Sequence, residues 1–161
     1  MTLLTARRVT VRPDFLAAMM LVLGGGAGLI SVLLPWMTRR EIGSSMSGWT
    51  YVTLGLSSGA GGDTGQTVSA YGVLGIAVAG GACILLGLST LLPITHQPLG
   101  AISLMLGLAV IGAVLWWSQE NQRSAGGFGA LFDQLGPGWF VAAAAGPLIL
   151  IGAIRALSRS D

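Results

Sequence analysis

The stretch FLAAMMLVLGGGAGLISVLLPWM, residues 15–37, decides the fold class of this chain. It contains no charged side chain, and its length is close to the roughly 20 apolar residues that an α-helix needs to cross a bilayer. A secretory signal peptide would instead have a shorter apolar run followed by a small-residue cleavage site. The sequence therefore predicts a first, uncleaved transmembrane helix over residues 15–37.

The composition of the whole chain points to the same class. Of its 161 residues, 53% are hydrophobic, 9% are charged and 26 are glycine, which is more apolar and less charged than a typical soluble domain. The net charge of +2 is too small to indicate nucleic acid as a partner. Cys83 is the single cysteine, so the chain can form neither an internal disulfide nor a Cys-based zinc site.

Three further apolar segments complete the predicted architecture. We predict transmembrane helices over residues 70–92, 99–117 and 139–157, the last interrupted and kinked at Gly146-Pro147. The short connection over residues 93–98 makes the second and third helices antiparallel neighbours. The predicted fold is a single-domain, all-α membrane protein with four transmembrane helices in an antiparallel bundle and two outer loops.

Small residues on the first two predicted helices are spaced for close contact between helices. Gly24 and Gly28 form a GxxxG pair, and Gly80, Cys83 and Gly87 are spaced along one side of the second helix. We predict that these two faces pack against each other. Cys83 is then a small packing residue rather than a reactive thiol.

The two long connections, residues 38–69 and 118–138, are predicted to lie outside the membrane. Residues 49–54 alternate polar with apolar or aromatic side chains and predict a short β segment in the first loop, followed by a Gly/Ser-rich turn over residues 57–65. In the second loop, four apolar residues share one helical face and predict a short helix in the membrane interface: Phe128, Leu131, Phe132 and Leu135. A loop with scattered apolar residues is the alternative there.

Arginines and tryptophans predict the orientation of the bundle. Five of the eight arginines lie near the two ends of the chain, which favours a multi-pass plasma-membrane protein with both termini in the cytoplasm. All five tryptophans and both tyrosines fall on the opposite, outer side. From them we predict a partner-binding surface formed by Trp36, Trp49, Tyr51, Trp116, Trp117 and Trp139. Membrane anchoring, with a hydrophobic underside for a folded cap, is the alternative.

The sequence offers no catalytic, metal-binding or cofactor-binding motif. No Asp, Glu, Lys or His lies inside a predicted span, whereas proton-coupled transporters need such groups in the bundle. His96, the single histidine, is predicted to be a solvated turn residue. Asp63, Glu120 and Asp133 all fall on the outer side, but their spacing does not predict a shared site. We therefore predict no enzyme activity and no cofactor.

Three short motifs resemble those of a loosely defined group of small actinobacterial four-helix membrane proteins. They are Leu34-Pro35-Trp36 at the end of the first helix, Gly48-Trp49 in the outer loop and Pro137-Gly138-Trp139 at the start of the last helix. The tryptophan-operon-associated membrane proteins are similar in this respect. The resemblance spans the whole topology and implies the four-helix plan, but no activity.

Two functions from different classes agree with these features. The first is a non-enzymatic accessory or scaffold subunit of a larger cell-envelope or respiratory membrane complex, which would bind other integral membrane proteins as well as membrane lipids. The alternative is a carrier or binding protein for an apolar lipid, held in a groove between the glycine-rich helices. A hydrolase built from the outer carboxylates is a third, weaker hypothesis.

Overall fold

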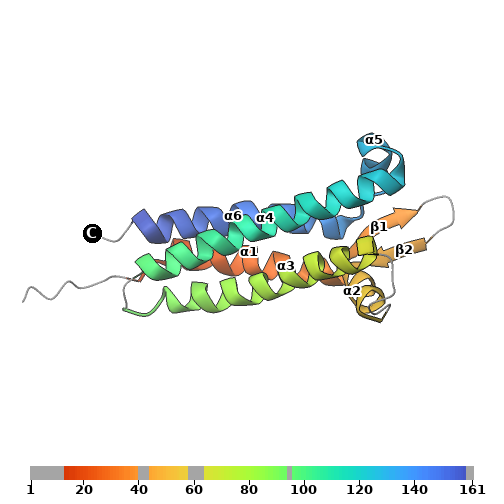
Figure 1. Cartoon of the computed structure of the whole chain (residues 1–161). Helices are drawn as coiled ribbons and strands as arrows, with labels where there is room; N and C mark the ends of the chain where they lie inside the picture. Colours follow the sequence, from red (N-terminus) through yellow and green to blue (C-terminus); the bar gives the residue numbers. More distant parts are fainter. Residues whose placement is uncertain (1–12, 40–43, 58–63, 94–95, 159–161) are drawn as a thin grey trace, which may run out of the picture.

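Four long helices form an antiparallel bundle with a small cap at one end, as the computed structural model shows for residues 13–39, 44–57, 64–93 and 96–158 (Figure 1). The four are α1 (Phe15–Leu33), α3 (Thr64–Ser89), α4 (Gln97–Ala125) and α6 (Pro137–Ser158). Each is long and apolar enough to cross a membrane. The prediction of an all-α, four-helix membrane protein is therefore confirmed.

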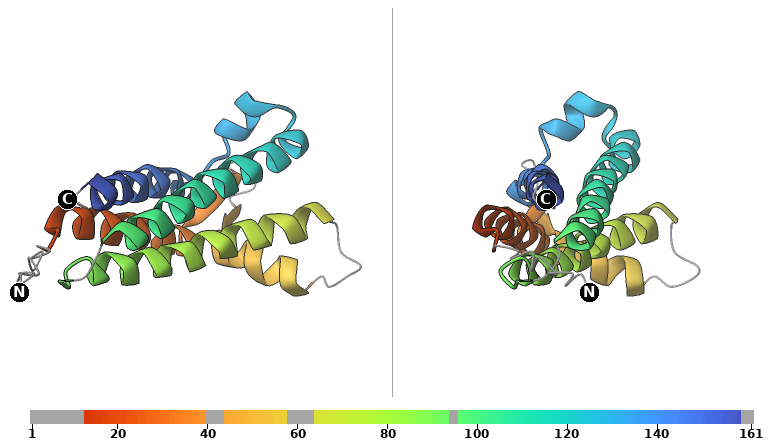
Figure 2. Two further views of the ribbon diagram at one scale, coloured as in Figure 1. Left: turned by 60° about the vertical axis from the view of Figure 1, so that its left-hand side comes forward. Right: turned by 90° about the vertical axis from the view of Figure 1, so that its left-hand side faces the viewer.

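The four helices form a ring when viewed along the bundle (Figure 2). Helix α1 packs against both α3 and α6, and α4 closes the ring on the other side by packing against the same two helices. The beginning of α1 and the end of α6 lie at one end of the bundle, which we call the terminal end. The opposite end, the cap end, carries all the shorter elements.

Helix α1 ends four residues earlier than predicted. Leu34 is already extended, with φ −84° and ψ 157°, because a residue that precedes a proline is disfavoured in the helical conformation. Pro35–Arg39 instead forms strand β1, which pairs antiparallel with β2, Ser44–Ser47. The predicted span over residues 15–37 thus combines a shorter helix with the first part of the cap.

The predicted β segment over residues 49–54 is wrong, because this stretch lies in helix α2, Gly48–Ser57. The Ser47 hydroxyl accepts a hydrogen bond from the Thr50 backbone N–H at 3.2 Å, and so satisfies a donor of the first turn. Gly48, Val52 and Gly55 are buried on one side of α2, which packs against α3. Burial of these helically spaced residues favours the helix more strongly than the local alternation of polar and apolar side chains favours a strand.

The third helix is longer than the predicted span over residues 99–117. Helix α4 continues eight residues beyond the predicted end at Trp117, because the polar run that follows consists of residues that are compatible with a helix. It stops only at Gly126 and Gly127, which have φ values of +86° and +130°. Such values favour glycine, and they allow the chain to reverse direction.

The short helix predicted in the second loop is present as α5, Phe128–Phe132. Its four apolar residues do not share one environment, since Leu131 is buried while Phe128 and Phe132 are exposed. The Gly/Ser-rich turn predicted over residues 57–65 lies mostly outside the described residues. Helix α6 continues through Pro147 without the predicted interruption.

Glycines bring the backbones of the long helices into direct contact. A Cβ atom added to Gly28 would lie 3.6 Å from Gly80 Cα, and one added to Gly87 would lie 3.0 Å from Leu21 Cβ, so these glycines form the contact between α1 and α3. Gly24 differs from the expectation, because its added Cβ would meet Ile149 of α6 at 2.8 Å. Helix α1 lies between α3 and α6, and its glycines therefore contact both of these helices. Cys83 is fully buried.

The terminal end is held by a polar contact that sequence reasoning missed. The Asp14 carboxylate accepts hydrogen bonds from the backbone N–H groups of Leu16 and Ala17, both at 3.1 Å, and so caps α1. The same Oδ1 lies 3.6 Å from Arg155 Nε on α6. His96 precedes α4 and is only 4% exposed, so the prediction that it is solvated is wrong.

We expect Gly25→Ala to lower stability by about 1 to 3 kcal/mol, because the new Cβ would meet the Gly80 carbonyl oxygen and would lie 3.0 Å from Ile84 N. Gly26→Ala is the matched control, since nothing lies within 4 Å of its added Cβ. The free energy of unfolding of each variant is measured in mixed detergent micelles. Equal stabilities of the two variants would contradict the close approach of α1 to α3.

Candidate functional site

The candidate site is the cap, where elements distant in sequence meet around aromatic side chains. The hairpin of β1 and β2 is extended by the segment before α6, since Met37 forms a bridge with Leu135 and the Thr38 N–H donates to Gln134 O at 2.8 Å. The Gly136 N–H donates to Trp36 O, also at 2.8 Å. Strand β1 is therefore hydrogen-bonded on both sides, which fixes it relative to α6.

Three aromatic rings form the centre of the cap, and we call them the aromatic core: Trp36, Tyr51 and Trp117. They come from β1, α2 and α4 respectively. The rings of Trp36 and Trp117 meet edge to face with centroids 5.1 Å apart, and Tyr51 meets Trp117 in the same way at 5.7 Å. Such pairs stabilise by about 0.5–1.5 kcal/mol beyond the burial of their area.

The polar atoms of this region are paired largely within the protein. Trp36 Nε1 donates to the Ser31 carbonyl at 2.7 Å, which satisfies an acceptor in the last turn of α1. Trp139 Nε1 donates to Ser118 Oγ at 2.9 Å and so joins α6 to α4. The Tyr51 hydroxyl donates to the sulfur of Met37 at 2.8 Å. The indole of Trp117 meets no acceptor among the described residues and is held there by its ring contacts.

Glycines make room for this arrangement. A Cβ atom on Gly138 would lie 2.6 Å from Trp36 Cδ1, and one on Gly48 would lie 3.0 Å from Trp36 Nε1. Any larger residue would displace the indole. The glycines of the Gly48-Trp49 and Pro137-Gly138-Trp139 motifs therefore make room for Trp36 and for the backbone at the end of α1.

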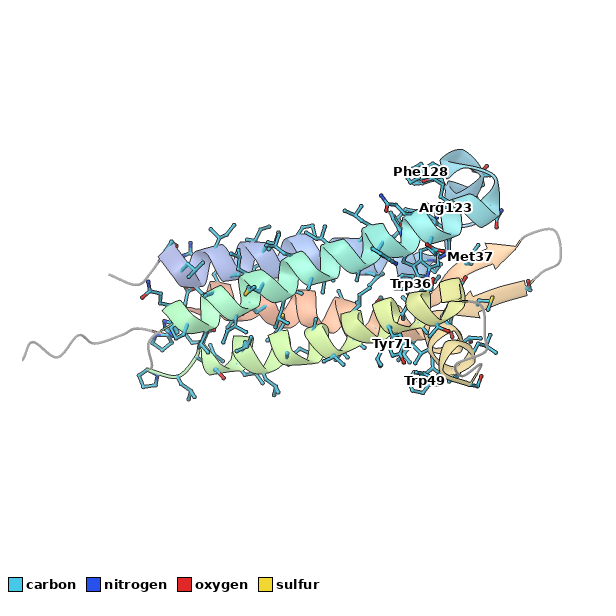
Figure 3. All side chains as sticks on the ribbon, in the orientation of Figure 1. Trp36, Met37, Trp49, Tyr71, Arg123 and Phe128 are labelled. Atoms are coloured by element: carbon cyan, nitrogen blue, oxygen red, sulfur yellow. The ribbon has the colours of Figure 1, made fainter. Side chains whose placement is uncertain are left out.

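The structure divides the six predicted partner-binding residues between the interior and the surface. All lie at the cap end, where Figure 3 labels Trp36 and Trp49. Trp36 and Trp117 are 0% and 1% exposed, whereas Trp49 and Trp116 are 55% and 57% exposed. Tyr51 and Trp139 are partly buried. The six residues do not form a single exposed cluster, because four of them are buried or partly buried in the cap: Trp36, Trp117, Tyr51 and Trp139.

The neighbours Trp116 and Trp117 illustrate this division. Successive residues on a helix point about 100° apart, so Trp117 enters the aromatic core while Trp116 faces outward from α4. The sequence contains no signal that separates the two tryptophans. Only the position of α2 and β1 beside α4 decides which of them is buried.

Acidic, histidine and cysteine side chains do not form a metal site in the described part of the chain, where no group of three or more comes together. Glu120 is partly exposed on α4 and Asp133 is exposed after α5. Asp63 lies outside the described residues. The described residues of the cap present mainly aromatic and apolar surface.

Comparison of the chain with protein-family models, with curated proteins and with solved structures found no match.

We expect Trp117→Ala to lower stability by about 3–5 kcal/mol, because removal of this large buried ring leaves a cavity beside Trp36 and Tyr51. Trp116→Ala, one residue earlier, should change stability by less than about 0.5 kcal/mol. The free energy of unfolding of these two variants is again measured in mixed micelles. A similar loss for the two variants would show that the cap is not organised around Trp117.

Proposed function

We propose that the protein is a non-enzymatic accessory or scaffold subunit of a larger cell-envelope or respiratory membrane complex. In this proposal, the exposed side of α2 binds another integral membrane protein. The observation that carries the proposal is the placement of Trp49, which is 55% exposed on a helix whose other side is fixed to the aromatic core through Tyr51. A rigidly held, exposed tryptophan is the kind of side chain that most often dominates binding energy at interfaces.

The exposed side of α2 is suited to burial against another protein. Helix α2 contains no Asp, Glu, Lys, Arg or His, and it exposes Leu54 and Leu56 as well as Trp49. Its exposed hydroxyls are already paired with its own backbone: Thr53 Oγ1 donates to Thr50 O at 3.1 Å, and Ser57 Oγ donates to Leu54 O at 3.0 Å. Covering this surface would therefore leave few polar groups without hydrogen bonds.

The bundle interior supports a structural role over the alternative of an apolar-lipid carrier. That alternative needs a groove between the glycine-rich helices. Gly25 and Gly80 instead face each other across α1 and α3, and Gly107 and Gly146 lie in the contact between α4 and α6. Neighbouring helices thus fill the faces that carry these four glycines.

For orientation, we propose that the cap faces outward from the plasma membrane and that both termini are cytoplasmic. The support is the arginine distribution in the sequence and the position of both described ends at the terminal end. We expect Thr53→Cys, in a Cys83→Ser background, to react with a membrane-impermeant thiol reagent in intact cells. Gln97→Cys in the same background should stay unlabelled until the cells are opened. The reverse pattern would overturn the orientation.

Purification in mild detergent tests the proposed function. We expect one or more membrane proteins to co-purify at a fixed ratio, and Trp49→Ala to weaken this association by about 2 kcal/mol, roughly 30-fold in Kd. Phe15→Ala at the terminal end is the matched control, since Phe15 is 75% exposed. The fold of both variants should be unchanged by circular dichroism. Co-purification of a lipid without any partner would favour the carrier instead.

A further inference from the structure

A second exposed surface lies on the α5 side of the cap, and we call it the aromatic ridge: Phe128, Phe132 and Phe140. These rings are 54%, 52% and 45% exposed. The rings contact one another in a row. The centroids of Phe128 and Phe132 are 6.4 Å apart, and those of Phe132 and Phe140 are 5.8 Å apart. The ridge therefore runs continuously from the beginning of α6 onto α5.

The ridge is held in place by the cap beneath it. Leu131 is 1% exposed and anchors α5 in the protein interior. The chain enters α5 through the reversal at Gly126 and Gly127, and it leaves through Gln134, whose carbonyl accepts the Thr38 N–H. Both ends of α5 are thus fixed, and its phenylalanines stay exposed because the inward side is already occupied by Leu131.

The length of the apolar part of α4 and its contacts with α6 indicate where we expect the ridge to lie relative to a membrane. The apolar part of α4, residues 99–117, is about 28 Å long at 1.5 Å per residue, close to the roughly 30 Å of a hydrocarbon core. Its cap-side end is therefore near the boundary. Trp139 lies at this level, because its indole donates to Ser118 Oγ at 2.9 Å. Phe140 is the next residue, so the ridge starts at the boundary and extends outward.

Arg123 supplies a positive charge beside the ridge. It is exposed in the last turn of α4, six residues beyond Trp117, which is about 9 Å along the helix axis. This distance is slightly more than the roughly 5–8 Å of one headgroup layer, and the long arginine side chain can reach back into that layer. Among the described residues, no carboxylate lies within ion-pair distance of its guanidinium, the one pair found there being Asp14 with Arg155. Figure 3 shows Arg123 and Phe128 at the same edge of the cap.

We propose that Arg123 and the aromatic ridge form a binding site for the anionic headgroup of a membrane phospholipid. A guanidinium can bind a phosphate through two parallel hydrogen bonds. The ridge then contacts the glycerol region at the boundary between headgroups and acyl chains, where the apolar face of an interfacial helix lies. The charge and the apolar surface match the two parts of one lipid, and each lies at the depth of the part that it would bind.

Native mass spectrometry of the detergent-solubilised protein, titrated with dioleoyl phosphatidylglycerol, tests this site. We expect tighter binding of phosphatidylglycerol than of phosphatidylcholine with the same chains. Arg123→Gln should raise the Kd for phosphatidylglycerol about fivefold, the factor that one arginine contributes near an anionic membrane surface. Arg159→Gln, which removes a charge far from the ridge in sequence, is the matched control. Equal Kd values for these two variants would overturn the proposal, as would competition by inorganic phosphate at concentrations similar to those of the lipid.

Nitroxide labels test the depth of the ridge independently of headgroup charge. In a Cys83→Ser background reconstituted into phosphatidylglycerol vesicles, a label at Phe132→Cys should be more accessible to oxygen, which partitions into lipid. A label at Asp133→Cys, one residue further on, should be more accessible to a water-soluble nickel chelate. Greater accessibility of both positions to the nickel chelate would place the ridge in water and overturn the proposal.

Discussion

The cap depends on one side chain, the indole of Trp36, and on the space that its neighbours leave for it. Its N–H donates to the Ser31 carbonyl at the end of α1, its backbone carbonyl accepts from Gly136, and its ring meets Trp117 of α4. Glycines at the start of α2 and of α6 approach the same ring. Four helices and a strand are thus placed relative to one another by a residue that is 0% exposed.

This dependence explains how the aromatic residues divide their roles. Trp36 and Trp117 stabilise the cap, and their burial allows Trp49 on α2 and the phenylalanines of α5 to be held rigidly at the surface. The two exposed surfaces differ chemically. The exposed side of α2 is uncharged and its hydroxyls are internally paired, which suits a protein partner. The α5 side combines aromatic rings with Arg123, which has no ion-pair partner among the described residues, and this suits an anionic lipid.

The two ends of the bundle are stabilised by different chemistry. At the cap end, apolar rings and glycines dominate. At the terminal end, the Asp14 carboxylate caps α1 and lies close to Arg155, and the Asp14 N–H donates to Thr90 O at 3.3 Å, so that α1, α3 and α6 are joined there. Between the two ends, glycines bring the long helices into close contact, as expected for helices that associate in lipid through close packing rather than through the hydrophobic effect.

The sequence by itself determined that the chain has four membrane-spanning helices, since each apolar segment must satisfy its backbone hydrogen bonds internally in lipid and only a helix does so within one segment. It also placed the tryptophans and tyrosines at one end. It did not determine the structure of residues 49–54, where local alternation indicated a strand; this stretch forms helix α2, which buries Val52 and Gly55 and packs against α3. Nor could it separate Trp116 from Trp117, or assign Gly24 to α6 and Gly28 to α3. Those outcomes depend on which elements pack beside each residue, and only the tertiary structure decided them.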